Sequence, residues 1–200
     1  MARRSDHSYR ELRDLIIDAA YDIVQEQGVE SLSARNLATK ISYSVGTLYN
    51  IFSNMNEIIL HLNARVLDHF VSELANKLNT SVSSSIENLL FIARYYLYFS
   101  ENHYNLWHML FINKIYINED APKWYKGKIA ALNKLVSHQI SLFNAPGIDT
   151  LLETSIYWAS VHGVVSLNNS EKLRYASEKN VDEILESAVR RIFLMYTSNA

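Results

Sequence analysis

The residues best suited to binding chemistry lie in one stretch, residues 33–52, with the sequence SARNLATKISYSVGTLYNIF. Its second half carries small and hydroxyl-bearing side chains where a helix could press against DNA. Elsewhere the chain contains no nucleophile elbow, phosphate-binding loop or HExxH metal pair. The stretch therefore favours a contact with nucleic acid over catalysis, and an ordinary helical hairpin within a bundle is the alternative.

Capping residues predict two short helices within this stretch. Ser33 is a favourable N-cap for the first, and Ser44 caps the second after a three-residue turn at residues 41–43. Leu48 and Phe52 lie four residues apart, so both face the core and turn the rest of their helix outwards. Two short helices with such a turn should cross steeply.

The other elements are expected to be helices that hold this stretch. Ser8 and Glu11 form a capping box that starts a first helix, and Gly28 ends it. A similar pattern at residues 54–57 starts a long fourth helix, which would connect head to body. Hydrophobic periodicity predicts five more helices, starting near residues 86, 104, 122, 150 and 180. Thr150 is the expected N-cap of the eighth helix, and the total is an all-α fold of about nine helices.

Composition agrees with a helical protein that has a sizeable core. Hydrophobic residues make up 48% of the 200 residues, and only two prolines and five glycines interrupt the chain. The absence of cysteine excludes disulfides, thiolate catalysis and cysteine-ligated metals. No run approaches the roughly 18 apolar residues that span a bilayer, so we expect a cytoplasmic protein without a membrane partner.

Charge is distributed unevenly along the chain. The net charge of -2 gives no overall basic footprint for nucleic acid. However, Arg3, Arg4, Arg10 and Arg13 crowd the first thirteen residues. This local basicity can suffice for a dimer that touches few phosphates.

Two helical faces near the end of the chain suggest pairing with a second copy. Ser155, Ala159 and Gly163 recur at four-residue steps, and small residues let another backbone approach closely. The last helix carries its own stripe, which includes Ile184, Ala188 and Ile192. Two such helices favour a two-fold, four-helix interface between subunits, and packing within the monomer is the alternative.

Two segments carry a family resemblance. R-N-L-A at residues 35–38 and S-V-G-T-L-Y-N-I-F at residues 44–52 match the pattern S-x-G-T-L-Y-x-Y-F of the TetR family of transcriptional regulators, which the chain resembles. W-A-S-V-H-G at residues 158–163 resembles the Trp-His-Gly signature of one C-terminal class in that family. The resemblance implies a homodimer with a helix-turn-helix DNA-binding domain at residues 1–53 and a ligand-binding and dimerisation domain at residues 54–200.

The resemblance also implies roles for individual residues in the head. Arg35 would reach a base or phosphate, whereas Ser44, Gly46 and Thr47 would begin the recognition helix, with backbone N–H groups and hydroxyls near phosphate. Tyr49 would contact phosphate. Sequence readout would lie among the more variable positions, which are Tyr43, Val45 and Asn50. Arg3, Arg4 and Arg10 would form a basic N-terminal arm.

Three positions depart from the family pattern. Ser42 stands where glycine is usual. If the turn requires a left-handed backbone there, serine adopts it at a cost in free energy. Ile51 replaces a common tyrosine or histidine, and Met55 or Asn56 stands where a lysine is common. The loss of that cation and that hydroxyl suggests weaker, less salt-dependent DNA binding or greater reliance on the N-terminal arm.

The body offers candidates for a pocket that is mostly apolar with a few polar groups. These candidates are Arg94, Tyr95, Tyr98, Phe99, Trp107, Phe111, Trp124, Trp158 and His162. Core packing is the alternative for most of the aromatic residues. Arg94 could meet an anionic ligand, but a structural ion pair or an extended side chain reaching solvent is the stronger expectation. We expect neither a metal nor a cofactor.

The leading hypothesis is a repressor that a small, mostly apolar effector releases from a double-stranded DNA operator. The first alternative is a binding protein or co-regulator of the same fold with weak or lost DNA binding. An enzyme acting on a hydrophobic substrate is the remote alternative.

Overall fold

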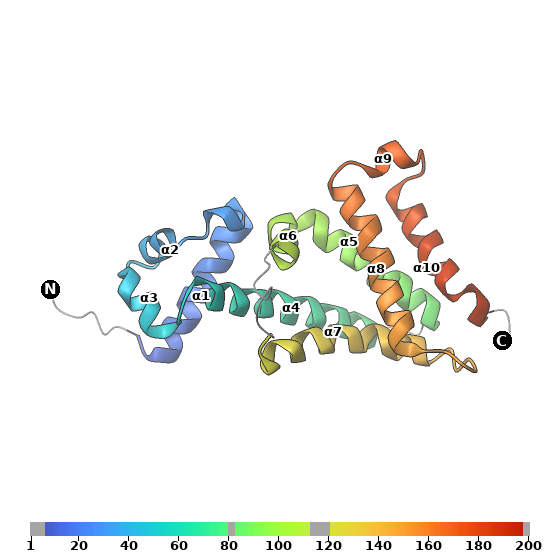
Figure 1. The fold of residues 1–200 in the computed structure, drawn as a ribbon, viewed down its shortest axis with the longest axis horizontal. Coiled ribbons are helices and arrows are strands. Elements are labelled where there is room, and N and C mark those ends of the chain that lie inside the picture. Colours follow the sequence, from blue (N-terminus) through green and yellow to red (C-terminus); the bar gives the residue numbers. More distant parts are fainter. Residues whose placement is uncertain (1–6, 80–82, 113–120, 198–200) are drawn as a thin grey trace. The chain divides into compact units, whose positions relative to one another are not determined.

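A computed structural model describes residues 7–79, 83–112 and 121–197 of the chain. Every regular element in these ranges is a helix, which confirms the expected all-α class (Figure 1). The elements are α1 (Tyr9–Gln27), η1 (Val29–Ser31), α2 (Ala34–Lys40), α3 (Val45–Ile51), α4 (Met55–Asn79), α5 (Ser85–Asn102), α6 (Tyr104–Ile112), α7 (Lys123–Ser141), α8 (Thr150–Asn169), α9 (Leu173–Ala176) and α10 (Val181–Thr197). None of these helices is both long enough and apolar enough to cross a membrane.

The chain divides into two compact units. Unit 1 comprises Met1–Leu67 and His103–Tyr125, and unit 2 comprises Asp68–Asn102 and Lys126–Ala200. Helices α4 and α7 therefore contribute residues to both units. The functional boundary expected after residue 53 stays a prediction, because a division by compactness does not test it.

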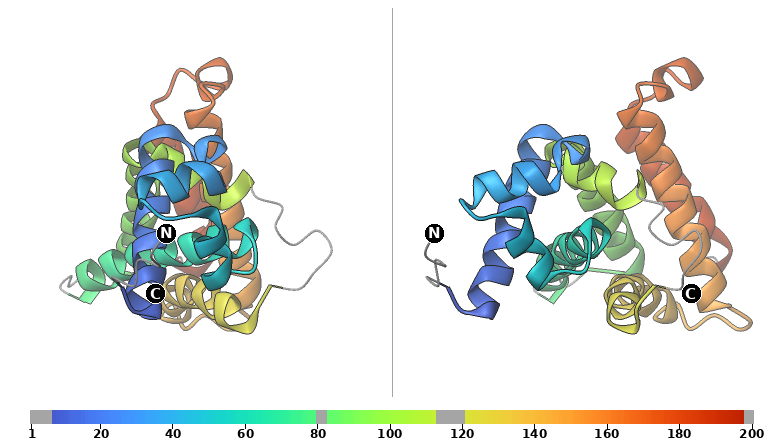
Figure 2. Two further views of the ribbon diagram at one scale, coloured as in Figure 1. Left: turned by 90° about the vertical axis from the view of Figure 1, so that its left-hand side faces the viewer. Right: turned by 60° about the vertical axis from the view of Figure 1, so that its left-hand side comes forward.

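In unit 1, α1 contacts α2, α3 and α6 (Figures 1 and 2). Its apolar stripe is buried there, with Ile16, Ala20 and Val24 fully inaccessible. The predicted capping box is confirmed: the Ser8 hydroxyl accepts the Glu11 N–H, and the Glu11 carboxylate accepts the Ser8 N–H. These bonds satisfy N–H groups that the first turn of a helix leaves without partners.

In unit 2, α8 and α10 lie side by side, and α5 contacts both (Figures 1 and 2). Tyr157 of α8 is completely buried, and its hydroxyl donates to the carbonyl of Leu89 at 2.7 Å. That bond satisfies the one polar group of a large buried side chain. Burial raises the pKa of Tyr157 well above its usual value, so the phenol stays protonated and remains a donor.

Two details of the C-terminal half differ from the sequence prediction. Asp149, not Thr150, caps α8, because its carboxylate accepts the N–H groups of Leu151 and Leu152. Asp149 has the extended backbone of an N-cap residue, whereas Thr150 is already the first residue of the helix, so the backbone places the cap one residue earlier. The short helix α9 was not predicted, because four residues are too few to show a hydrophobic period.

A chain of charged side chains joins α5 to α10. The Arg94 guanidinium donates to Asp182 at 2.8 and 3.1 Å and to Glu186 at 2.8 Å. Arg190 donates to the other oxygen of Glu186 at 2.8 Å and to Glu87 at 2.9 Å. Arg94 therefore forms the structural ion pair that was the stronger of its two expectations.

We expect Arg94→Met to lower the free energy of unfolding at neutral pH by about 1 kcal/mol or less, because these pairs are partly exposed and screened. Hydrogen bonding to Arg94 lowers the pKa of Asp182. A lowered carboxyl pKa stabilises the folded state above the unfolded-state value, and that stabilisation is lost as pH falls through the folded-state value. The deficit of the variant should therefore shrink in urea titrations as pH falls below the unfolded-state value of about 3.9. Arg174→Met, at an exposed pair with Glu171, is the control and should change little; a deficit independent of pH would contradict the ionic role.

Candidate DNA-binding site

Helices α2 and α3 form the predicted pair, and their caps are as expected. The Ser33 hydroxyl accepts the N–H of Asn36 at 3.2 Å, and the Ser44 hydroxyl accepts the N–H of Thr47 at 3.2 Å. The hydroxyls of Ser44 and Thr47 also lie 2.9 Å apart. Each cap satisfies one of the N–H groups that the first turn of its seven-residue helix leaves without a partner.

The turn between the two helices depends on one strained residue. Ser42 has φ of 58°, the left-handed conformation expected of this position. For a residue with a side chain, that conformation costs roughly 1–2 kcal/mol. The N–H of Tyr43 then donates to the carbonyl of Ala38 at 3.0 Å and closes the turn.

Helix α3 buries one face and exposes the other. Leu48 and the C-cap residue Phe52 are 0% and 1% exposed, as the four-residue spacing predicted. The opposite face carries the predicted recognition residues: Val45, Gly46, Tyr49 and Asn50 are exposed, and Thr47 is half-buried. Arg35 on α2 is exposed as well, whereas Tyr43 is half-buried.

Two residues at the start of the first helix contact the turn before α3 and the end of α3. His7 Nδ1 lies 2.7 Å from the Tyr43 hydroxyl, next to the Ser44 cap. The Tyr9 hydroxyl donates to the carbonyl of Ile51, the last residue of α3, at 3.2 Å. Sequence reasoning missed both residues, because 36 and 42 positions separate the partners and no local pattern links them. Arg10 is exposed, and Arg3 and Arg4 lie outside the described residues.

The recognition region is free of acidic side chains. Residues 31–56 contain neither aspartate nor glutamate, while they include Arg35 and Lys40. Both cations of α2 are exposed, and Lys40 is paired with Asp22 of α1 at 3.5 Å. A segment without carboxylates of its own adds no repulsion of a polyanion, although Asp22 of α1 and Glu57 of α4 lie beside it.

The ligand-pocket candidates fall into both units. Trp107, Phe111 and Trp124 belong to unit 1, and the other six belong to unit 2. Within unit 2, the ring of Tyr96 contacts Trp158 edge-on at 5.6 Å, and its hydroxyl lies 2.9 Å from His162 Nδ1. Burial lowers the pKa of His162. The indole nitrogen of Trp158 is buried and has no hydrogen-bond partner among the described residues.

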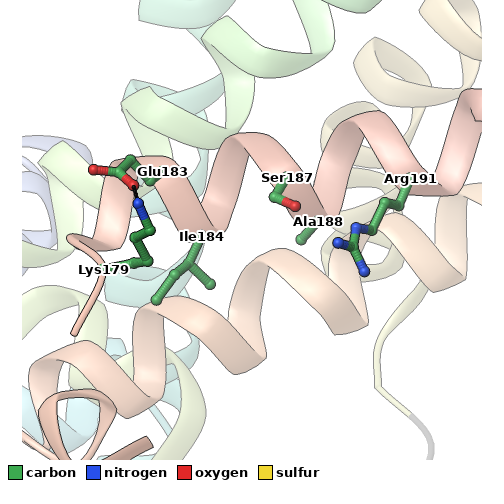
Figure 3. Close-up of a pocket in the computed structure, with 6 residues that line it drawn as sticks. All are labelled: Lys179, Glu183, Ile184, Ser187, Ala188 and Arg191. Atoms are coloured by element: carbon green, nitrogen blue, oxygen red, sulfur yellow. Dashed lines mark ion pairs between the residues drawn. The ribbon is translucent and has the colours of Figure 1, made fainter. Parts of the chain in front are cut away.

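The dimer-interface candidates lie on accessible faces of α8 and α10. Ser155 and Ala159 are exposed, and Gly163, Ile184, Ala188 and Ile192 are half-buried. A Cβ added at Gly163 would meet no atom within 4 Å, so packing within the described chain does not require this glycine. A shallow hollow of about 530 Å³ follows α10 and includes Ile184 and Ala188, with Lys179 and Glu183 at one end and Arg191 at the other (Figure 3).

Comparisons with known proteins agree with this geometry. Residues 16–62 match the family model described as bacterial regulatory proteins, tetR family. An HTH-type transcriptional regulator of Staphylococcus aureus (strain MRSA252) is 27% identical over 94 residues, 47% of this chain and 50% of that protein. The HTH-type regulator PksA of Bacillus subtilis (strain 168) is 36% identical over 59 residues, 30% of this chain and 28% of PksA. The chain thus spans half or less of the length of these curated relatives.

Structural similarity extends over nearly the whole chain. The crystal structure of the transcriptional regulator FadR from Bacillus subtilis in complex with stearoyl-CoA superimposes with a TM-score of 0.70 and 14% identity, covering 90% of this chain and 96% of FadR. At this identity the likeness shows the fold alone. The α2–α3 pair has the form of a helix-turn-helix. Residues 16–62 are similar to bacterial regulatory proteins of the tetR family, and the two relatives are HTH-type transcriptional regulators.

Proposed function

We propose that this protein is a ligand-responsive transcriptional regulator that binds a double-stranded DNA operator as a homodimer. The observation that carries the proposal is the exposed face of α3, which presents Val45, Gly46, Tyr49 and Asn50 within a stretch, residues 31–56, that contains no aspartate or glutamate. A dimer would place two such helices in successive major grooves, about 34–36 Å apart, on a pseudo-palindromic site.

Replacing one cation of α2 and one hydroxyl of α3 tests the proposal. We expect Arg35→Ala and Tyr49→Phe to weaken binding to an operator selected from random duplexes. Arg35→Ala should also lower the slope of log K against log salt by about 1 for each lost phosphate contact, as measured by fluorescence anisotropy. Lys134→Ala on α7, also exposed, is the matched control and should leave the slope unchanged.

A wild-type protein that selects no duplex and shows no salt dependence would contradict the proposal. That result would favour the alternative, a binding protein of the same fold with weak or lost DNA binding. Ile51 and Met55, where the family pattern has a hydroxyl or ring nitrogen and a cation, motivate this alternative. Both side chains are half-buried, so neither is presented to DNA as fully as Tyr49.

Unit 2 supports a role in effector binding. Tyr96, Trp158 and His162 bring together aromatic surface and polar groups, the composition of most small-molecule sites. We assign Trp158, His162 and Gly163 of α8 to a C-terminal domain of the Trp-His-Gly class. FadR, of the same fold, holds stearoyl-CoA. We therefore propose a small, mostly apolar effector with a hydrogen-bond acceptor for the Trp158 N–H. We also propose that the protein is a repressor and that effector binding releases it from its operator.

The exposed face of α8 and α10 supports the homodimer. Leu152, Ile156 and Leu167 of α8 and Leu194 of α10 are large apolar side chains that are 39–62% exposed. They flank the small residues Ser155 and Ala159. Contiguous apolar surface of this kind marks an interaction site, and a two-fold axis would bury the same face of both copies.

A further inference from the structure

Aromatic and cationic side chains from four helical elements meet within unit 1. They are Arg13 of α1, Phe52 at the end of α3, His61 of α4 and Trp124 in the first turn of α7. The indole of Trp124 stacks on the imidazole of His61, with ring centres 4.4 Å apart and planes at 5°. The His61 ring also contacts Phe52, with ring centres 5.6 Å apart.

Arg13 completes this cluster from the side of α1. Its Nη2 lies 3.0 Å from His61 Nδ1 and 2.9 Å from His61 Nε2. Nearly equal distances to both ring nitrogens place Nη2 over the imidazole face. The same guanidinium lies over the Phe52 ring at 5.6 Å, within the usual range of a cation–π contact.

The protonation state of His61 is compatible with this arrangement. Burial and the neighbouring Arg13 lower the pKa of His61, and Glu57, 3.9 Å away on the same helix, opposes them. A neutral imidazole avoids repulsion by the Arg13 guanidinium and keeps its face available for stacking. The cluster is therefore favoured at neutral pH.

A second contact fixes the same turn of α7 to α4. Tyr125, the residue after Trp124, is buried, and Asn63 hydrogen-bonds to its phenol. Trp124 itself is 41% exposed, so burial alone does not explain its position. The stack on His61, two residues before Asn63 on α4, gives this half-covered indole a specific partner.

We propose that Trp124 is a positioning residue whose stack on His61 holds α4 against Arg13 and Phe52, and thereby sets the orientation of the recognition helix α3. Phe52 is the residue that ends α3, so the contact acts directly at the end of that helix. Helix α7 continues without a break into unit 2. A change in the first turn of α7 therefore changes the stack and, through it, the contacts at the end of α3. The DNA readout of this proposal rests on the proposed function.

Hydrogen exchange in the full-length protein tests the positioning role without DNA. Trp124→Leu should retain the apolar cover of α7 but lose the stack, and amides of residues 45–61 should exchange about tenfold faster, the factor that corresponds to about 1.4 kcal/mol. Trp124→Phe keeps a ring on His61 and should restore protection. Ile129→Ala, on the same helix and also 41% exposed, is the matched control and should leave residues 45–61 unchanged. Equal exchange in Trp124→Leu, Trp124→Phe and wild type would overturn the proposal.

Operator affinity separates this proposal from the proposed function. With an operator selected from random duplexes, Trp124→Leu should bind about tenfold more weakly, whereas its affinity for a random duplex stays at the wild-type value. A wild-type protein without sequence-selective binding would refute the proposed function, while hydrogen exchange would still decide the positioning role. Faster exchange with unchanged operator affinity would overturn the link from Trp124 to the recognition helix.

Discussion

Gly46→Ala is expected to yield a protein at least as stable as wild type that binds its operator more than tenfold more weakly. A Cβ at Gly46 would meet only the Ser44 hydroxyl, at 3.7 Å, which is an ordinary contact. Alanine in place of a helical glycine stabilises by about 0.5–1 kcal/mol. The change therefore stabilises the folded chain. The added methyl group projects from the exposed face of α3, where it would block the close approach to phosphate that the proposed complex requires.

The prediction is easy to test, because stability and operator affinity should change in opposite directions. Thermal denaturation should show an equal or higher melting temperature, and fluorescence anisotropy should show weaker operator binding. Gly127→Ala on α7 is the matched control, because Gly127 is also helical and exposed and has open space at its Cβ. The control should gain stability without losing affinity. An unchanged affinity in Gly46→Ala would indicate that α3 does not approach the DNA backbone at this residue.

Ala159→Arg is expected to convert the proposed dimer into a monomer and to weaken operator binding about 100-fold or more. Ala159 is exposed between the large apolar side chains of α8, so an arginine there would bury a charge in the proposed interface. Two linked heads gain a factor of about 10²–10⁴ over one head, because the second contact is intramolecular. A monomer loses this gain but keeps its affinity for a half-site.

Sedimentation velocity at micromolar concentration would measure the oligomeric state, and anisotropy would compare whole and half operators. Ala131→Arg, an equal change at an exposed position of α7, should remain dimeric. Because Ala159 is solvent-exposed in the single chain, arginine there does not disturb the core, and circular dichroism should match wild type. Persistence of the dimer in Ala159→Arg would place the subunit interface elsewhere.

Local chemistry explains why the head could be predicted in detail. The hydroxyls of Ser8, Ser33 and Ser44 act within three residues, so their caps follow from the sequence. The buried Leu48 and Phe52 follow from helical spacing, and the strain at Ser42 follows from the turn it must close. The family resemblance of residues 44–52 added the DNA-binding hypothesis, which the match over residues 16–62 supports.

Contacts between distant residues explain what could not be predicted. In the sequence, Arg94 is a cation in an apolar helix. Its partners, Asp182 and Glu186, are about 90 positions away, so no local pattern identifies them. Trp124 is one of many aromatic residues in the sequence, and only the fold shows that it stacks on His61. Asp149 differs for a local reason, since both Asp149 and Thr150 are acceptable caps and the backbone geometry selects between them.

The sequence by itself determined the all-α class, the boundaries of the α2–α3 pair and which face of α3 is exposed, because capping and periodicity act over three or four residues. Only the tertiary structure decided that His7 contacts the turn before α3, that Tyr9 contacts the end of α3, and that Trp124 joins Arg13, Phe52 and His61. These contacts depend on how helices far apart in the chain pack together, and no local energy term specifies that packing.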